Sequence, residues 1–139
     1  MRIMGLDFGS KTVGVAVSDE LGLTATGIEI VRRDSPNKLR KTLARIEALI
    51  NEYNVDQIVL GYPVMLDGSE GERVEKTKEF ATMLHRRTNL EIIFQDERLT
   101  TVEAYEIMDL AGIKREDRYK YVDQVAAQVI LEDYLNSNN

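Results

Sequence analysis

The sequence predicts one α/β domain, spanning residues 1–139, with a mixed five-stranded sheet that is covered by helices on both faces. Its length fits the usual size of about 100–150 residues for a single domain. Hydrophobic residues make up 43% of the chain, which is enough apolar side chain for a core. Strand patterns come first, and helical patterns then alternate with strands, in the order β-β-β-α-β-α-β-α-α.

Three strands open the chain, and we expect them over residues 3–8, 13–18 and 24–32. The segment between the first two, Gly9-Ser10-Lys11-Thr12, is too short for a crossover helix, so this pair should be antiparallel. Alternation along the third strand predicts two faces, with Ile28, Ile30 and Arg32 on one and Gly27, Glu29 and Val31 on the other. We therefore expect an antiparallel meander.

The later strands are separated by helical segments, which implies that these strands run parallel. Ser35-Pro36 predicts a helix start, since serine caps helices and proline fits the first helical position. Buried-type strands are expected over residues 57–62 and 91–94. Between them, Ser69-Glu70-Gly71-Glu72 has the spacing of a capping box. A last helix is expected over residues 121–135, with alanines that let it pack closely on the sheet.

Composition excludes several kinds of chemistry. The chain has no cysteine, so disulfides, thiolate zinc sites and cysteine nucleophiles are ruled out, and a reducing compartment is expected. The N-terminus does not have the layout of a signal peptide, and no apolar run reaches the roughly 18 residues that span a membrane, so we expect a cytoplasmic protein without a membrane partner. A net charge of −6 argues against non-specific coating of nucleic acid, but it allows an enzyme that acts through bound cations.

The end of the first strand carries the first candidate site. Asp7 lies where α/β sheets place their sites, and Gly5, Gly9 and Gly14 around it indicate close approach of the backbone to a ligand or partner. A P-loop is excluded, because Lys11 follows a serine rather than a glycine and leads into a strand. An ordinary hairpin with turn glycines and a solvated aspartate is the alternative interpretation.

The pattern Asp-x-Gly-x-[Lys/Thr]-x-x-Gly, formed by Asp7, Gly9, Lys11 and Gly14, is similar to the first strand pair of two groups. In the actin-like and sugar-kinase ATPases this loop holds phosphate. In the ribonuclease H-like nucleases the aspartate binds metal. An ATPase of the first group needs a second lobe to close over the nucleotide, which one short domain cannot supply.

Two further acidic positions could join Asp7. Glu97, beside Asp96, lies between a predicted strand end and a helix start, where the helix dipole stabilises an anion by about 0.3–1 kcal/mol. Asp123 lies in the first turn of the last predicted helix. Each also has a plain structural explanation: a solvated loop for the first pair and dipole stabilisation for Asp123.

Carboxylates from three separate elements could meet at one edge of the sheet. Such a trio can hold two divalent ions about 3.5–4 Å apart, the arrangement that cleaves a phosphodiester by in-line attack of water. We therefore expect Asp7, Glu97 and Asp123 to be catalytic and to bind Mg²⁺ or Mn²⁺, which prefer oxygen ligands.

Basic side chains near these positions could contact a phosphate backbone. We expect Lys11, Arg73 and Arg98 to bind substrate. A wider basic patch would add Lys76, Arg118 and Lys120, although most basic residues on helices are solvated. His85, the only histidine, is expected to be a solvated charge at a helix end rather than a general base.

The sequence resembles the YqgF/RuvX family, described as pre-16S rRNA nucleases and as Holliday-junction-resolvase-like proteins. Four ordered motifs carry this resemblance and together cover nearly the whole chain. They are residues 5–19, residues 61–63 with 67–71, residues 96–104, and residues 122–127 with Ile130-Leu131.

The resemblance implies a ribonuclease H-like fold and metal-dependent nuclease activity in maturation of the 16S rRNA 5′ end, with catalytic carboxylates at Asp7, Glu97 and Asp123. Its implied partner is nucleic acid: precursor rRNA, with branched DNA as the alternative substrate. Two departures stand out, since Lys11-Thr12 replaces a common Lys-Arg and Glu116-Asp117 dilutes a basic run. A non-catalytic RNA-binding factor in ribosome assembly is a further alternative.

Overall fold

The structure, a computed structural model, describes residues 1–63, 71–96 and 100–138, and their side chains except those of residues 100–103 and 138. Within these ranges the strands are β1 (Ile3–Phe8), β2 (Thr12–Ser18), β3 (Ala25–Arg32), β4 (Gln57–Tyr62) and β5 (Ile92–Asp96). The helices are α1 (Arg40–Tyr53), α2 (Glu72–Thr88), α3 (Thr100–Leu110), the 3-10 helix η1 (Arg115–Lys120) and α4 (Val122–Asn138). None of these helices has both the length and the apolar composition that a membrane span requires.

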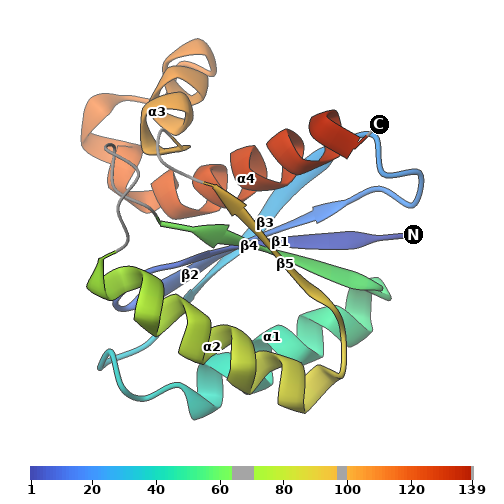
Figure 1. The fold of residues 1–139 in the computed structure, drawn as a ribbon. Coiled ribbons are helices and arrows are strands. Elements are labelled where there is room, and N and C mark those ends of the chain that lie inside the picture. The colour runs from blue at the N-terminus through green and yellow to red at the C-terminus, as the bar shows by residue number, and fades with distance from the viewer. Residues whose placement is uncertain (64–70, 97–99, 139) are drawn as a thin grey trace.

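The described strands form one mixed sheet in the order β3-β2-β1-β4-β5. The pairs β1–β2 and β2–β3 are antiparallel, and the pairs β1–β4 and β4–β5 are parallel. Helix α4 covers one face of the sheet, and α1 and α2 cover the other (Figure 1). The predicted architecture is confirmed, and the carboxyl ends of the parallel strands share one edge, where α/β sheets place their sites.

The sheet face beneath α1 and α2 is packed with large apolar side chains. Leu6 of β1 and Val15 of β2 are completely buried there against Ile46 of α1. The Phe80 ring of α2 stacks on Phe8, with ring centroids 4.2 Å apart. Full burial stabilises each such side chain by about 1.5–3 kcal/mol, so this face supplies much of the stability of the fold.

The opposite face presents small residues where α4 crosses it. A Cβ added at Gly5 would lie 2.7 Å from the Leu131 Cβ, and one added at Gly27 would lie 2.6 Å from the Gln124 Cγ. Ala127 is completely buried in the same interface. The α4 backbone therefore approaches the strands closely, and the predicted tight packing of this helix is confirmed.

Strand β3 departs from the predicted alternation at a β-bulge. Two successive residues of β2 pair with Glu29 and Gly27, so Ile28 is an extra residue on β3. Gly27 consequently faces α4, whereas Glu29 faces α1 and accepts hydrogen bonds of 2.8 and 2.6 Å from Arg45. The prediction that Gly27 and Glu29 share a face is wrong, because the bulge shifts the two-residue period.

Two predicted helix starts also differ from the structure. Ser35-Pro36 lies in a turn, whose hydrogen bond to the Ser35 carbonyl is 3.1 Å long, and α1 begins only at Arg40. Helix α2 begins at Glu72, with Gly71 as its N-cap and no hydrogen bond from a capping side chain. The predicted cap, Ser69, lies outside the described residues. The Ser35-Pro36 signal thus lies near α1 but does not begin it.

Candidate active site

Asp7 lies at the end of β1, on the sheet face covered by α4. Side chains alternate along a strand, so Asp7 shares its face with Gly5, whereas Leu6 and Phe8 point into the core beneath α1 and α2. Asp7 is partly buried, and its partner across the antiparallel pair is Gly14 of β2. Its carboxylate thus projects from a strand end beside a position that has no side chain.

Asp123 reaches the same place from the first turn of α4. A Cβ added at Gly14 would overlap the carbonyl oxygen of Asp123, so the α4 backbone lies directly on β2 next to Asp7. Thr12, on the same face as Gly14, donates a 2.6 Å hydrogen bond from Oγ1 to Oδ2 of Asp123.

This packing brings together the two elements, β1–β2 and α4, that carry two of the three predicted catalytic carboxylates. Gly14 pairs with Asp7 across the antiparallel strands, and the backbone of Asp123 packs directly on Gly14. Glu97 lies outside the described residues, so its part in the site stays a prediction. Within the part of the chain that the structure describes, no three His, Cys, Asp or Glu side chains form a group that could hold a metal ion.

Asp96, the neighbour of Glu97 in sequence, is on the other side of the sheet from Asp7. It ends β5 and pairs with Tyr62 of β4. Residues paired in parallel strands share a face, and Tyr62 follows Leu60, which is buried beneath α1 and α2, by two positions. The register therefore separates Asp96 from the Asp7 face.

Two of the three predicted substrate-binding residues lie beside the end of β1. Lys11 is exposed at the turn between β1 and β2. Arg73, in the first turn of α2, donates from Nη2 to the Phe8 carbonyl at 3.2 Å. The third, Arg98, lies outside the described residues. The end of the Asp7 strand is thus flanked by positive charge from two different elements.

The more distant cations of the predicted patch are engaged elsewhere. Arg118 pairs with Asp109, and Lys120 pairs with Asp117 at 3.1 Å. The hydrogen bond that Lys120 donates to Asp117 raises the pKa of Lys120. His85 is exposed at the far end of α2, with Nδ1 2.8 Å from a backbone carbonyl. These side chains interact within their own surface regions rather than with the site.

A cleft of about 680 Å³ opens beside the site, between the β1–β2 turn and α2. Thr12 and Asp123 line it on the side of the carboxylates. Arg73 and Lys76 line it from α2, and Arg33 lines it from the end of β3. Hydroxyl, carboxylate and cationic groups thus meet in one cleft, a combination that suits a phosphate ester.

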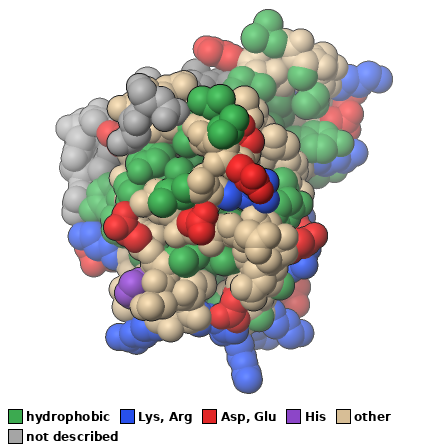
Figure 2. Space-filling view, turned by 90° about the vertical axis from the view of Figure 1, so that its right-hand side faces the viewer, with side chains coloured by type: hydrophobic (Ala, Val, Ile, Leu, Met, Phe, Trp, Pro, Cys, Tyr) green, Lys and Arg blue, Asp and Glu red, His purple; other side chains and the backbone are tan. Residues whose placement is uncertain are grey.

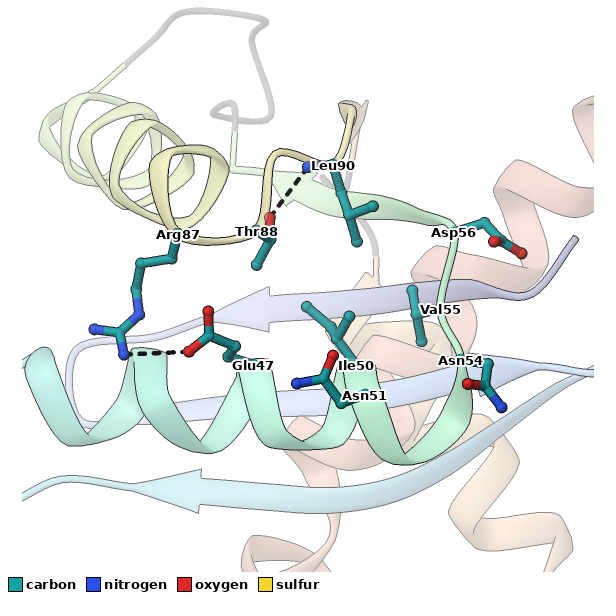
Figure 3. Close-up of a pocket in the computed structure, with 9 residues that line it drawn as sticks. All are labelled: Glu47, Ile50, Asn51, Asn54, Val55, Asp56, Arg87, Thr88 and Leu90. Atoms are coloured by element: carbon teal, nitrogen blue, oxygen red, sulfur yellow. Dashed lines mark hydrogen bonds and ion pairs between the residues drawn. The ribbon is translucent and has the colours of Figure 1, made fainter.

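A second cavity, of about 390 Å³, lies at the opposite edge of the sheet, where β4 and β5 begin (Figure 3). Its polar groups interact with each other: Arg87 lies 3.4 Å from Glu47, and the Leu90 amide donates to Thr88 Oγ1 at 3.2 Å. On that side of the molecule, acidic side chains are scattered and basic ones gather mostly at the lower rim (Figure 2). The charges do not converge there as they do at the first cleft.

Two residues of the site were not predicted individually. Thr12 holds Asp123, and its signal was available, because this position departs from the Lys-Arg common in the family that the sequence resembles. Arg33 is only 9% exposed although it directly follows a strand. Nothing in the sequence distinguishes it from a solvated arginine at a strand end.

The described donors suit a hard divalent cation. Asp7 and Asp123 would offer carboxylate oxygens from two elements, and the chain has no thiol that would favour a softer metal. Thr12 restrains one of these carboxylates through its hydroxyl. The residues therefore fit Mg²⁺ or Mn²⁺, with Glu97 as the expected third ligand.

Curated proteins of similar sequence match the chain over nearly its full length. One from Agathobacter rectalis, named "Putative pre-16S rRNA nuclease", is 66% identical over 136 residues, covering 98% of this chain and 95% of its own. Proteins of the same name from Lachnospira eligens and Halothermothrix orenii are 53% and 44% identical. They cover 99% and 100% of this chain, which covers 98% and 97% of theirs.

Solved structures share the fold at low sequence identity. Thermus thermophilus RuvC bound to a Holliday junction matches with a TM-score of 0.61 and 14% identity, over 99% of this chain and 96% of that chain. The fowlpox virus Holliday junction resolvase matches with a TM-score of 0.61 and 19% identity, over 100% of both chains. The fold is ribonuclease H-like, as predicted. Residues 1–137 match the RuvX family, described as Holliday junction resolvase, and the chain belongs to that family.

Proposed function

We propose that this chain is a nuclease that hydrolyses phosphodiester bonds with Mg²⁺ or Mn²⁺ and processes the 5′ end of precursor 16S rRNA in the cytoplasm. The names of its full-length relatives and the description of its family support nuclease chemistry. The observation that carries the proposal is the contact of the Asp123 backbone in α4 with Gly14, the residue that pairs with Asp7 at the end of β1.

In this proposal Asp7 and Asp123 hold the cation, with Glu97 as the third ligand. The hydroxyl of Thr12 binds one oxygen of Asp123 and so restrains the direction in which that carboxylate points. A bound divalent ion supplies stabilisation of the negative charge that develops on the phosphate during hydrolysis. The substrate backbone is held by the positive charges of Lys11, Arg73 and Arg98.

A cleavage assay on a precursor 16S rRNA fragment, with and without Mn²⁺, tests this function. Asp7→Asn keeps the shape of the side chain but removes an anionic ligand, so we expect the rate to fall at least about 100-fold. The matched control is Asp133→Asn, the same substitution further along α4, which should cleave at the wild-type rate. Cleavage by Asp7→Asn at the wild-type rate would show that the site is wrongly assigned.

A four-way DNA junction is the second substrate to test. The family description and the fold shared with RuvC, at a TM-score of 0.61, favour it as the alternative. We expect the wild-type protein to cut the rRNA precursor faster than the junction. Cleavage of the junction alone would establish a branched-DNA resolvase. Binding of RNA without cleavage of either substrate, with metal present, would instead indicate a non-catalytic assembly factor.

A further inference from the structure

Arg33, directly after β3, carries a buried guanidinium. The residue is 9% exposed, and it donates from Nη2 to the Gly9 carbonyl at 2.5 Å and from Nε to the Pro36 carbonyl at 3.4 Å. The guanidinium carbon lies 4.9 Å from the centre of the Phe8 ring. These contacts fix the charge beside the turn that follows Asp7.

No described carboxylate neutralises the positive charge of Arg33. Among the described residues, no carboxylate forms an ion pair with it, and its buried Nη1 has no hydrogen-bond acceptor. A guanidinium has five N–H donors, and burying a cation without a counter-charge is unfavourable. Burial lowers the pKa of Arg33 accordingly. An anion that enters from solvent would supply the missing counter-charge.

Arg33 shares the 680 Å³ cleft with two further cations, Arg73 and Lys76 of α2. Arg73 donates to the Phe8 carbonyl at 3.2 Å, and Arg33 donates to the next carbonyl, that of Gly9, at 2.5 Å. The two guanidinium groups therefore flank the same turn of the chain. Neither has a carboxylate partner among the described residues.

The same cleft also contains carboxylates, namely Glu72, Glu79 and Asp123. Glu72 lies 3.6 Å from Lys76, but their side chains are 85% and 56% exposed, so this pair is weak and Lys76 is free to turn toward another anion. Asp123 belongs to the cation site and accepts the hydrogen bond from Thr12. Glu79 is exposed on α2, so it does not offset the buried charge of Arg33. The buried charge available to a ligand is therefore that of Arg33, with Arg73 and Lys76 beside it in the cleft.

We propose that this cleft binds a phosphate group of the substrate strand, next to the phosphate that is cleaved at Asp7 and Asp123. The inference rests on the proposed nuclease function and adds a second phosphate site to it. Arg73 and Lys76 contact the phosphate, and Arg33 supplies buried positive charge behind the turn. Asp123 lines the same cleft, so one continuous strand reaches both sites.

Binding of inorganic phosphate to the full chain, without metal and so without cleavage, tests the site directly. We expect phosphate to shift the side-chain NMR signals of Arg33 and Arg73 until they saturate. Arg73→Gln combined with Lys76→Gln should weaken this binding by about tenfold, because two charged contacts are lost. Arg87→Gln, in the cavity at the opposite edge, is the matched control and should bind like the wild type. Shifts that do not saturate, or an equal loss in Arg87→Gln, would overturn the proposal.

A mononucleotide and a short single-stranded oligoribonucleotide distinguish a substrate strand from a small phosphate ligand. We expect the oligoribonucleotide to displace phosphate and to shift signals of Arg33 and Thr12 together, with higher affinity than the mononucleotide. If RNA leaves Arg33 unchanged while the mononucleotide shifts it, the assignment to the substrate strand is wrong. These measurements do not need cleavage, so a wild-type protein that fails to cut RNA refutes the proposed function without deciding whether the cleft binds phosphate.

Variants of Arg33 itself test the role of the buried charge. Arg33→Lys keeps the charge and Arg33→Met removes it, so we expect phosphate affinity to fall in the order wild type, Arg33→Lys, Arg33→Met. If Arg33→Met does not fold, the comparison of Arg33→Lys with the wild type decides, because lysine cannot reproduce the contacts of the guanidinium. Wild-type affinity in every folded Arg33 variant would remove Arg33 from the site.

Discussion

Helix α4 and the pair α1 and α2 cover opposite faces of one sheet, but they meet it through different kinds of contact. Beneath α1 and α2, large side chains interlock, as in the stack of Phe80 on Phe8. Beneath α4, the strands present glycines, and the helix backbone itself touches Gly14. Side chains can change rotamer when a neighbour changes, whereas two backbones in contact can only move apart. The carboxylates of the proposed site lie on the face that is less able to adjust.

The largest loss of stability is expected on the sheet face beneath α1 and α2. Phe80→Ala removes a completely buried ring that stacks on Phe8, and we expect the free energy of unfolding to fall by about 4 kcal/mol. Urea denaturation measures this loss. Cleavage per folded molecule should stay within about twofold of the wild type, because Asp7 and Asp123 are on the other face. A much larger loss of cleavage would show that the two faces are coupled.

The next largest effect is expected on the sheet face beneath α4, where one added methyl group should disturb the site. In Gly14→Ala the new methyl group overlaps the Asp123 carbonyl, so α4 must shift away from β2. We expect a loss of about 3 kcal/mol in the free energy of unfolding and about 100-fold in kcat.

Val13→Ala, one residue earlier on β2, provides the control for Gly14→Ala. Val13 is completely buried on the other face, so its truncation should destabilise the fold by about 2 kcal/mol and leave kcat nearly unchanged. Wild-type cleavage by Gly14→Ala would mean that α4 is free to adjust, and the contrast between the faces would not hold.

A smaller effect is expected from the one side chain that holds Asp123 in place. Thr12→Val keeps the shape of threonine but loses the 2.6 Å hydrogen bond to Oδ2. One charged hydrogen bond contributes about 1.5 kcal/mol, which corresponds to about tenfold in kcat. Thr12→Ser retains the hydroxyl and should cleave nearly as fast as the wild type. Equal rates for the valine and serine variants would assign the positioning of Asp123 to the backbone contact alone.

The smallest effect is expected from the contact of Arg45 with Glu29, on the sheet face beneath α1 and α2. The hydrogen bond from Arg45 holds the pKa of Glu29 below its ordinary value. The unfolded chain therefore binds a proton more readily at this position, and the stabilisation is present above the ordinary glutamate pKa. It is lost as the pH falls through the lower pKa of the folded state. The free energy of unfolding of Glu29→Gln, taken from denaturation curves at several pH values, should lack this part of the acid dependence. The packing of Gly27 against α4 should not change.

Much of the fold could be predicted because its signals are local. Alternation and apolar runs located the strands, and the short segment after Gly9 required an antiparallel pair. The bulge at Ile28 could not be predicted, because it depends on which residues of β2 lie opposite. Ser35-Pro36 has the composition of a helix start, yet its carbonyl groups are used by a turn and by Arg33 instead.

The candidate site was only partly accessible to sequence reasoning. Asp7 and Asp123 could be singled out by their positions at a strand end and a helix start. The packing of α4 on β2 near Asp7 depends on Gly14, whose role as a contact for α4 exists only in the folded protein. The burial of Arg33 likewise comes from packing against Phe8 and Gly9 rather than from its own neighbours in sequence.

The hydrogen bond between Thr12 and Asp123 joins residues 111 positions apart. During synthesis the opening meander leaves the ribosome early, whereas α4 emerges last among the described elements, and contacts between distant residues form slowly. The proposed cation site therefore cannot exist in a nascent chain or in an intermediate that has not yet docked α4. RNA near an unfinished chain would therefore not be cleaved, because the proposed nuclease site forms only when the fold is complete.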